Sequence, residues 1–396
     1  MPLPLEGVRI LAISQFGAGP YATMMLAELG AEIIKIEDPS VGGDVSRGVP
    51  PYLAENDSLY FQSFNRNKKS LTLNLKAPEG RRVFLELVRV SDAVFCNLRG
   101  DQIEKLGLSY SALEEANPRI VSCALVGFST TGDRAGEPGY DYLMQAYAGY
   151  MSLTGDPSGP PAACGVSVID HAAGFAAALG LVAALYSASK TGAGRDVEVS
   201  LLDTAYSMTT YLAIWNLNRD YQPVRREGSA HQTLVPVQTF RTSDGHIVIF
   251  CGKEKFWQEL CASLGAADLI SDQTFNTFAK RSQHRELVVS RLQEIFSQRT
   301  TREWVDLLRG KVPCAPVNDL SQAMREPFLG ERGMIVETRH PIFGTIRQIG
   351  GPFKMGGEKL NHRRAPALGE HTAEILKNYL GYDENRIGQL REKQVV

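Results

Sequence analysis

The N-terminal segment carries the pattern that most constrains the fold: a strand, a glycine turn, a helix and a second strand in close succession. The apolar run Val8–Ser14 precedes a turn at Gly17–Pro20, and helical periodicity over Tyr21–Leu29 stops at Gly30. The apolar-rich run Glu32–Glu37 follows. Two strands joined through a helix within roughly thirty residues form a βαβ unit, which requires a parallel sheet.

The same alternation continues toward the middle of the chain. Helices are predicted at Gly80–Val90, up to Leu113–Asn117 and, as a long Ala-rich helix, at Asp170–Ser189. The strands predicted after them are Ala93–Cys96, Ile120–Leu125 and Asp196–Leu202. Helices between successive parallel strands are typical of a doubly wound α/β fold. We therefore predict a large α/β domain over residues 1–215.

The pattern changes after this region. The polar stretch Arg225–His231 resembles a linker, and the runs before and after Ser243–Gly245 indicate a β-hairpin. Three helical segments follow it, at Phe256–Leu264, Arg285–Phe296 and Arg302–Leu308. We predict a small α+β domain over 220–335, with 336–396 returning to the large domain and ending in one capped helix, Gly369–Gly381.

Composition excludes several classes of protein. The 396 residues include 42 basic and 44 acidic side chains, so no charge bias indicates a nucleic-acid or membrane partner. The longest apolar run, Ala172–Tyr186, is shorter than the ~20 residues of a membrane span, which predicts a buried helix. No export signal begins the chain, and no cysteine pair has metal-ligand spacing, so a cytoplasmic protein without a metal site is expected.

One motif imitates a dinucleotide-binding fingerprint. Gly17, Gly19 and Ala22 follow a strand, with Glu37 and Asp38 about twenty residues further on. Pro20 weakens the match, because proline lacks one of the N–H groups that should face a pyrophosphate. An NAD-dependent oxidoreductase is one hypothesis; a tight turn between a strand and a helix is the alternative.

Several runs along the whole chain resemble family III CoA-transferases, the CaiB/BaiF family that contains the formyl-CoA and carnitine CoA-transferases. They are Gly19–Thr23, Gly30–Glu37, Asn65–Ser70, Asn117–Val121, Gly139–Tyr142, Thr191–Arg195, Ser200–Asp203, Val312–Asp319, Arg332–Met334 and Leu368–Thr372. The resemblance implies a Rossmann-like large domain, an inserted smaller α+β domain and an interlocked homodimer. It also implies a transferase with acyl-CoA and a small carboxylic acid as substrates and no permanently bound cofactor.

In this family an aspartate is the covalent nucleophile, and the matching residue is Asp170. The resemblance implies an aspartyl anhydride followed by an aspartyl-CoA thioester. A small dicarboxylic or branched acid as acceptor, with succinyl-CoA as donor, is our hypothesis for the substrates. The residues around Asp170 predict that it opens the Ala-rich helix, where an N-cap and the helix dipole favour the ionised carboxylate. A purely capping aspartate is the alternative. The adjacent His171 points about 100° away on a helix and is not expected to form a dyad.

The resemblance also carries CoA contacts onto seven positions: Ala18, Leu73, Lys76, Asn97, Arg99, Lys105 and Tyr140. Lys68 and Lys69 are further candidates. Clustered cations suit the phosphates of CoA, although each lysine can equally be a solvated surface charge. Asp141 matches an acidic residue near the nucleophile, where it orients a substrate or pairs with a basic neighbour. His231 and Gln232 are candidates for the acceptor acid, with an ordinary loop histidine as the alternative.

Three departures narrow the substrate. The formyl-CoA and oxalate members have glutamine at the position of Gly17, arginine at Asp38 and four glycines near 230–233, so an oxalate-specific enzyme is not expected. Racemases on the same fold carry histidine where this chain has Tyr140, and tyrosine is a poor base at neutral pH. A racemase, and a CoA-binding protein without catalysis, remain the alternatives to a transferase.

Overall fold

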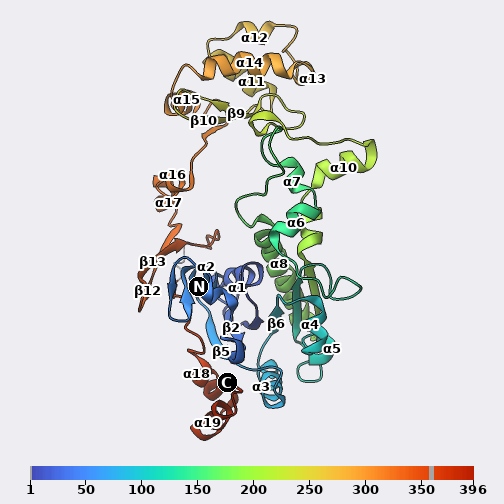
Figure 1. Cartoon of the computed structure of the whole chain (residues 1–396), viewed down its shortest axis with the longest axis vertical. Coiled ribbons are helices and arrows are strands. Elements are labelled where there is room, and N and C mark those ends of the chain that lie inside the picture. Colours follow the sequence, from blue (N-terminus) through green and yellow to red (C-terminus); the bar gives the residue numbers. More distant parts are fainter. Residues whose placement is uncertain (1, 356–360) are drawn as a thin grey trace. The chain divides into compact units, whose positions relative to one another are not determined.

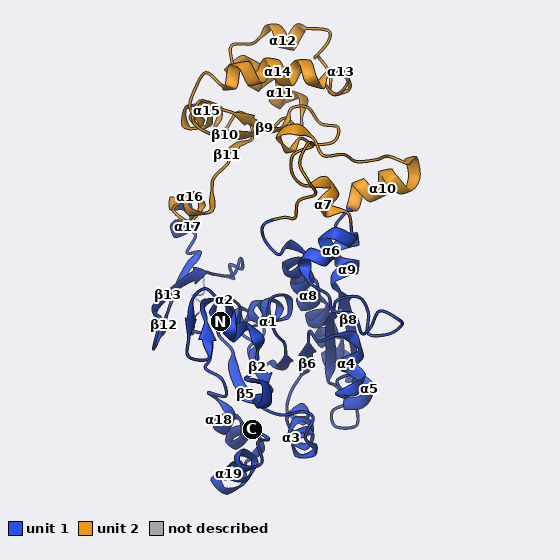
Figure 2. Ribbon diagram, in the orientation of Figure 1, with its two compact units in different colours: residues 1–148, 165–209, 328–396 blue, residues 149–164, 210–327 orange. Residues whose placement is uncertain are grey.

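The computed structural model describes residues 2–355 and 361–396, which divide into two compact units. Residues 1–148, 165–209 and 328–396 form unit 1, and residues 149–164 and 210–327 form unit 2 (Figure 2). The sequence-based division put the small domain at 220–335. The structure differs chiefly by adding the short segment 149–164 to unit 2, so the chain leaves unit 1 twice.

In the described residues, unit 1 is built on a parallel sheet of six strands (Figure 1). In chain order they are β1 (Arg9–Ile13), β2 (Glu32–Glu37), β5 (Lys69–Thr72), β6 (Ala93–Cys96), β7 (Val121–Val126) and β8 (Arg195–Ser200). Their spatial order is β5-β2-β1-β6-β7-β8, with every neighbouring pair parallel. This is the doubly wound order, and it reverses between β1 and β6. The parallel α/β class is therefore confirmed.

Helices cover both faces of this sheet. Leu11, Ile34 and Val94 pack with residues of the C-terminal helices in one buried cluster, while the alternating strand residues Ile10 and Phe95 face the other way. The first face is covered by α3 (Pro78–Arg89), α4 (Gly100–Lys105), α18 (Thr372–Leu380) and α19 (Glu384–Glu392). The second face holds α1 (Ala18–Glu28) and α8 (Val168–Thr191), which pack on each other.

The long Ala-rich helix α8 is buried on one side only. Its 24 residues pack against β7, β8 and α1 through small side chains such as Ala173, Ala177 and Ala184. Leu179 and Tyr186 on another side are 72% and 67% exposed, so the predicted burial of this helix holds for one of its sides. By length and composition alone α8 could cross a membrane, but core helices of folded domains meet the same criteria.

The remaining elements of unit 1 are short. They are β3 (Leu53–Ala54), β4 (Asp57–Ser58), α2 (Leu59–Asn65), α5 (Tyr110–Leu113), α6 (Asp141–Tyr147), α9 (Leu201–Ser207), α17 (Pro327–Glu331), β12 (Ile335–His340) and β13 (Gly344–Ile349). The predicted strand Asp196–Leu202 ends at Ser200, whose hydroxyl accepts from the N–H of Asp203 and starts α9. The C-terminal segment forms two helices rather than the predicted one, because Gly381 ends α18 and Asp383 caps α19.

Unit 2 has its own sheet and core. The predicted hairpin is confirmed as β9 (Val237–Arg241) and β10 (His246–Phe250), and β11 (Cys314–Pro316) pairs with β10. Its helices are α7 (Tyr150–Leu153), α10 (Thr210–Arg219), α11 (Glu254–Ser263), α12 (Asp268–Ser271), α13 (Phe278–Gln283), α14 (Arg285–Phe296), α15 (Thr301–Leu308) and α16 (Leu320–Ala323). Trp257, Phe296 and Trp304 fill the core between sheet and helices.

Candidate active site

A cavity of about 120 Å³ opens at the carboxyl ends of the central strands of unit 1. Its walls come from the segments that directly follow strands: Gln15–Ala18 after β1, Asn97–Arg99 after β6, Gly127 after β7 and Leu201 after β8. Gly139, Tyr140 and Asp170 complete it. The cavity includes the β1/β6 reversal, the place where doubly wound sheets bind their ligands.

Asp170 reaches this cavity from the first turn of α8. It is the third helical residue rather than the cap, since Ser167 holds the N-cap position. The capping role belongs to Asp141 at the start of α6: its Oδ1 accepts the backbone N–H groups of Ile169 (2.7 Å) and Asp170 (3.2 Å). The prediction that Asp170 itself caps the helix was therefore wrong. Because a different carboxylate satisfies the helix end, the side chain of Asp170 stays available.

The pKa of Asp170 also differs from the expectation that its position on the helix favours the ionised carboxylate. Burial raises the pKa of its carboxyl to about 7, and the negative charge of Asp141 adds to the rise. Within residues 2–355 and 361–396 the Asp170 carboxylate has no hydrogen-bond or ion-pair partner. The helix dipole is therefore outweighed by loss of solvent and a like charge. A carboxylate of this kind is more basic, and hence a stronger nucleophile once ionised, than an ordinary aspartate.

Glycines bring backbone directly against the reactive side chains. A Cβ placed on Gly17 would lie 2.8 Å from Oδ2 of Asp170, and one on Gly19 would lie 2.5 Å from Cγ of Asn97. On the opposite wall, a Cβ on Gly127 would lie 2.6 Å from Cα of Gly139. A side chain at Gly17 would have to displace the Asp170 carboxylate, and one at Gly127 would meet backbone, so the cavity wall beside Asp170 is main chain.

Four of the predicted CoA-contact residues line the cavity with Asp170: Ala18, Asn97, Arg99 and Tyr140. Asn97 is held by both ends of its amide, accepting from the N–H of Gln15 (2.8 Å) and donating to its carbonyl (2.9 Å). Tyr140 is 55% exposed, with its ring at an edge-on angle to that of Phe16.

The other predicted contacts do not line it. Lys76 and Lys105 are exposed cations paired with Asp38 (3.6 Å) and Asp101 (2.6 Å). Leu73 is buried in the sheet core. Lys68 is buried too, where its ammonium donates to the Pro20 carbonyl (2.8 Å) and to Asn65 (2.9 Å). Burial and the charge of Lys35 push the pKa of Lys68 well below its ordinary value, so this side chain is poorly placed to meet a phosphate.

His231 and Gln232 belong to unit 2. The His231 ring stacks on Tyr211, and its Nδ1 accepts from the N–H groups of Thr233 and Leu234. Gln232 bonds both backbone groups of Val224. These contacts give both residues a local structural role within unit 2, and their predicted contact with an acceptor acid stays a prediction.

His171 packs rather than pairs. Its ring lies edge-on to Tyr21 and stacks on Phe64, and burial lowers its pKa. In the described part of the chain no three His, Cys, Asp or Glu side chains gather as a metal site.

Sequence reasoning missed Phe16, Gly17 and Gly127 as site residues. The signal that finds them is topological: each follows a parallel strand at its carboxyl end, and such ends share one edge of the sheet.

Comparisons with known proteins agree on the class that this fold and site define. The model of "CoA-transferase family III" matches residues 5–372. The chain therefore belongs to this family, and the enzyme is a family III CoA-transferase. The resemblance seen in the sequence is thereby confirmed.

Individual relatives extend the comparison. Human succinyl-CoA:glutarate CoA-transferase is 35% identical over 99% of this chain and 90% of its own length. Succinyl-CoA:mesaconate CoA-transferase of Haloarcula hispanica is 34% identical, covering 97% and 98%. The crystal structure of a CaiB/BaiF family protein from Brucella suis superposes with a TM-score of 0.82 at 30% identity, covering 96% and 100%.

Proposed function

We propose that this enzyme moves CoA from succinyl-CoA to a small dicarboxylic acid through covalent intermediates on Asp170. The observation that carries the proposal is the unpaired Asp170 carboxylate opening on the cavity, with main chain directly beside it. The human and archaeal relatives, which are named for transfer to glutarate and mesaconate, support the substrate class.

In the proposed first half-reaction, an Oδ atom of Asp170 attacks the donor thioester carbonyl. The C–S bond breaks, CoA leaves as thiolate, and a mixed anhydride forms. The thiolate then attacks Cγ of Asp170 and releases the donor acid as carboxylate, leaving an aspartyl-CoA thioester. Because each bond broken is replaced by an equally activated one, no ATP is consumed.

In the second half-reaction, the acceptor carboxylate attacks the aspartyl thioester and forms a new anhydride. The released thiolate then takes the acceptor acyl group and frees Asp170. Each addition creates an oxyanion, which needs fixed donors. The first-turn N–H groups of α1 at Ala18 and Gly19 support this role, because α1 has no side-chain cap and begins at the cavity.

A racemase of the same fold needs an acid/base pair on opposite sides of a substrate carbon. Among the described residues that line the cavity, Arg99, Tyr140 and Asp170 are the titratable ones. An arginine guanidinium and a tyrosine hydroxyl are both poor proton acceptors at neutral pH, so this set supports transfer better than racemisation.

The exposed apolar side of α8 supports a further proposal, a homodimer with interlocked chains. Phe175, Leu179 and Tyr186 are 38%, 72% and 67% exposed along one helix, and such surfaces mark association sites. Sedimentation of the active enzyme at dimer mass is expected, and an active monomer contradicts the dimer.

The reaction is tested with succinyl-CoA and a panel of free acids that includes glutarate, mesaconate and oxalate. New CoA thioesters of the dicarboxylic acids are expected by mass spectrometry. Hydroxylamine added during turnover should convert Asp170 to the hydroxamate, located by peptide mapping. Absence of any new thioester, or an adduct on another residue, contradicts the proposal.

A further inference from the structure

The turn that joins β1 to α1 is held in an unfavourable conformation beside the nucleophile. Phe16 has a φ of 63°, a region that bulky residues rarely occupy unless their surroundings impose it. The next residue, Gly17, is the one whose Cβ would lie 2.8 Å from Oδ2 of Asp170. The position of this turn therefore decides how much space and water the Asp170 carboxylate has.

Each residue of the turn before Gly17 has an anchor. Gln15 is bonded to Asn97 through both backbone groups, as described above. The N–H of Phe16 donates to Oδ1 of Asp44 (3.2 Å), and the carbonyl of Ser14 accepts from Nζ of Lys35. Asp44 precedes the 3₁₀ turn Val45–Gly48 and approaches from outside the sheet, so it fixes Phe16 by a long-range contact.

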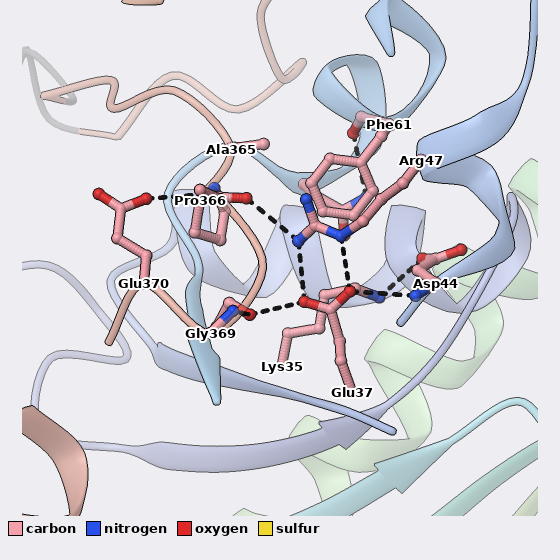
Figure 3. A network of polar contacts seen from close by, with 12 residues as sticks. Lys35, Glu37, Asp44, Arg47, Phe61, Ala365, Pro366, Gly369 and Glu370 are labelled. Atoms are coloured by element: carbon pink, nitrogen blue, oxygen red, sulfur yellow. Dashed lines mark hydrogen bonds and ion pairs between the residues drawn. The ribbon is translucent and has the colours of Figure 1, made fainter. Parts of the chain in front are cut away.

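Asp44 and Lys35 form a fully buried ion pair. Nζ of Lys35 lies 2.8 Å from Oδ2 of Asp44, and both side chains are 0% exposed. Figure 3 shows the pair beside Glu37 and Arg47. Oδ1 of Asp44 also accepts the N–H of Ser46 (2.9 Å), and the Asp44 N–H donates to Glu37 (3.1 Å). Burial by itself raises the pKa of Asp44, but the charge of Lys35 and these hydrogen bonds hold it below its ordinary value.

We propose that Asp44 is a positioning residue for the transfer reaction: held by Lys35, its carboxylate fixes Phe16 in the left-handed conformation and thereby sets the Gly17 backbone against Asp170. This inference rests on the proposed role of Asp170. A buried pair that only stabilises the fold has no need to reach the N–H of the one residue before Gly17.

Two double variants separate positioning from stability. Lys35→Met/Asp44→Asn removes both charges but keeps an oxygen that accepts the Phe16 N–H. Lys35→Met/Asp44→Leu is equally neutral and of similar size but lacks that acceptor. Because neither leaves an unpaired buried charge, direct electrostatic effects on Asp170 cancel in the comparison.

We expect the Asn variant to keep kcat within a few-fold of the wild type. The Leu variant should lose about 100-fold in kcat, since small displacements of a reacting group have effects of that size. The acid limb of its pH–rate profile should also move to lower pH, because a displaced turn admits water to Asp170. The charged and polar groups facing that carboxylate, Asp141 and Tyr60, are unchanged.

A buried pair away from the turn is the matched control. Nε of Arg66 donates to Oε1 of Glu28 over 2.5 Å, and the side chains of Glu28 and Arg66 are 0% and 2% exposed. Glu28→Gln/Arg66→Met should lower the melting temperature but leave kcat and the acid limb unchanged.

If the Leu variant does not fold, Asp44→Glu replaces it. This variant keeps the anion beside Lys35 but displaces its oxygens by one methylene, so a lower kcat is expected.

Equal kcat and equal acid limbs in the Asn and Leu variants, or wild-type values in Asp44→Glu when that variant is used, overturn the inference. If the proposed function itself is wrong, the wild-type enzyme forms no adduct on Asp170, and this result distinguishes the two failures.

Discussion

Two acidic side chains of unit 1, Asp170 and Glu37, lie in surroundings that shift their pKa values in opposite directions. At the cavity, Asp170 lacks a cationic partner among the described residues, and burial together with the nearby charge of Asp141 raises its pKa to about 7. Beside β2, Glu37 is buried against Arg47, with their side chains 1% and 3% exposed and 2.8 Å apart. Burial favours a raised pKa at both places, yet the hydrogen bonds and charge of Arg47 hold the pKa of Glu37 below its ordinary value.

The comparison shows what a partner does to a buried acid. Glu37 also accepts from Ser70, while Arg47 donates to the Pro366 carbonyl, so this network ties the C-terminal segment to β2 and β5 (Figure 3). A paired carboxylate is stable but inert. An unpaired one costs stability and keeps its lone pairs for a substrate. Unit 1 therefore contains a buried acid that is paired, Glu37, and an unpaired acid at the cavity, Asp170, which is the proposed nucleophile.

The largest effect on turnover is expected from removing the carboxylate of Asp170, the proposed nucleophile. Asp170→Ala should lower turnover by at least about 10³-fold while CoA affinity stays near the wild-type value, because the nucleophile is lost and the cavity walls are kept. The folded-state pKa of Asp170 is raised, so its ionisation destabilises the native state as pH rises toward about 7. The variant should therefore unfold at a higher urea concentration than the wild type at pH 8.

Turnover of Asp170→Ala above a few per cent of the wild-type rate contradicts the assignment of the nucleophile. Glu337→Ala, which changes an exposed acid on β12 that does not line the cavity, is the control for a general effect of removing negative charge.

Changes to the Glu37–Arg47 pair should instead lower the stability of the fold. Arg47→Met leaves Glu37 buried without its cation, which should lower the free energy of unfolding by about 3–5 kcal/mol. Since the folded-state pKa of Glu37 is lowered, the contribution of this pair is present above the ordinary pKa of the acid and lost on acidification. Urea unfolding at pH 7 and pH 4 measures both.

Glu37→Gln/Arg47→Met supplies the control, because it removes both charges and should recover much of the loss. Equal stability of Arg47→Met and the wild type at pH 7 would show that the network does not hold the fold.

The smallest effect is expected at Asp141. Wild-type kcat/KM should fall about tenfold per pH unit below a pKa near 7, because Asp170 must be ionised to attack. Asp141→Asn keeps an oxygen to cap α8 but removes the like charge. The acid limb should then move to lower pH by a fraction of a unit, because burial is the larger cause of the raised pKa.

An acid limb that moves upward in Asp141→Asn, or does not move, contradicts the electrostatic role of Asp141. Melting temperature serves as the control, since asparagine caps helices about as well as aspartate.

Much of the architecture was predictable from local pattern. β2 and β6 begin and end at the predicted residues, and α14 does as well, because apolar alternation, turns and caps act over a few residues. The strand β5 was not predicted: it is four residues long, begins with Lys69 and gains its order from pairing with β2. The second C-terminal helix, α19, was also missed, because its burial against α3 is a long-range effect.

The candidate site divides in the same way. By itself the sequence determined the parallel α/β class and the family, because these depend on local periodicity and on motifs along the chain; Asp170 as the nucleophile stays a prediction from the family resemblance. Only the tertiary structure decided that Asp141 caps α8, that Lys68 is buried and that Asp44 reaches Phe16. It also decided the ionisation of Asp170, since the pKa of a carboxyl depends on the solvent and charges that folding brings around it, whatever their distance along the chain.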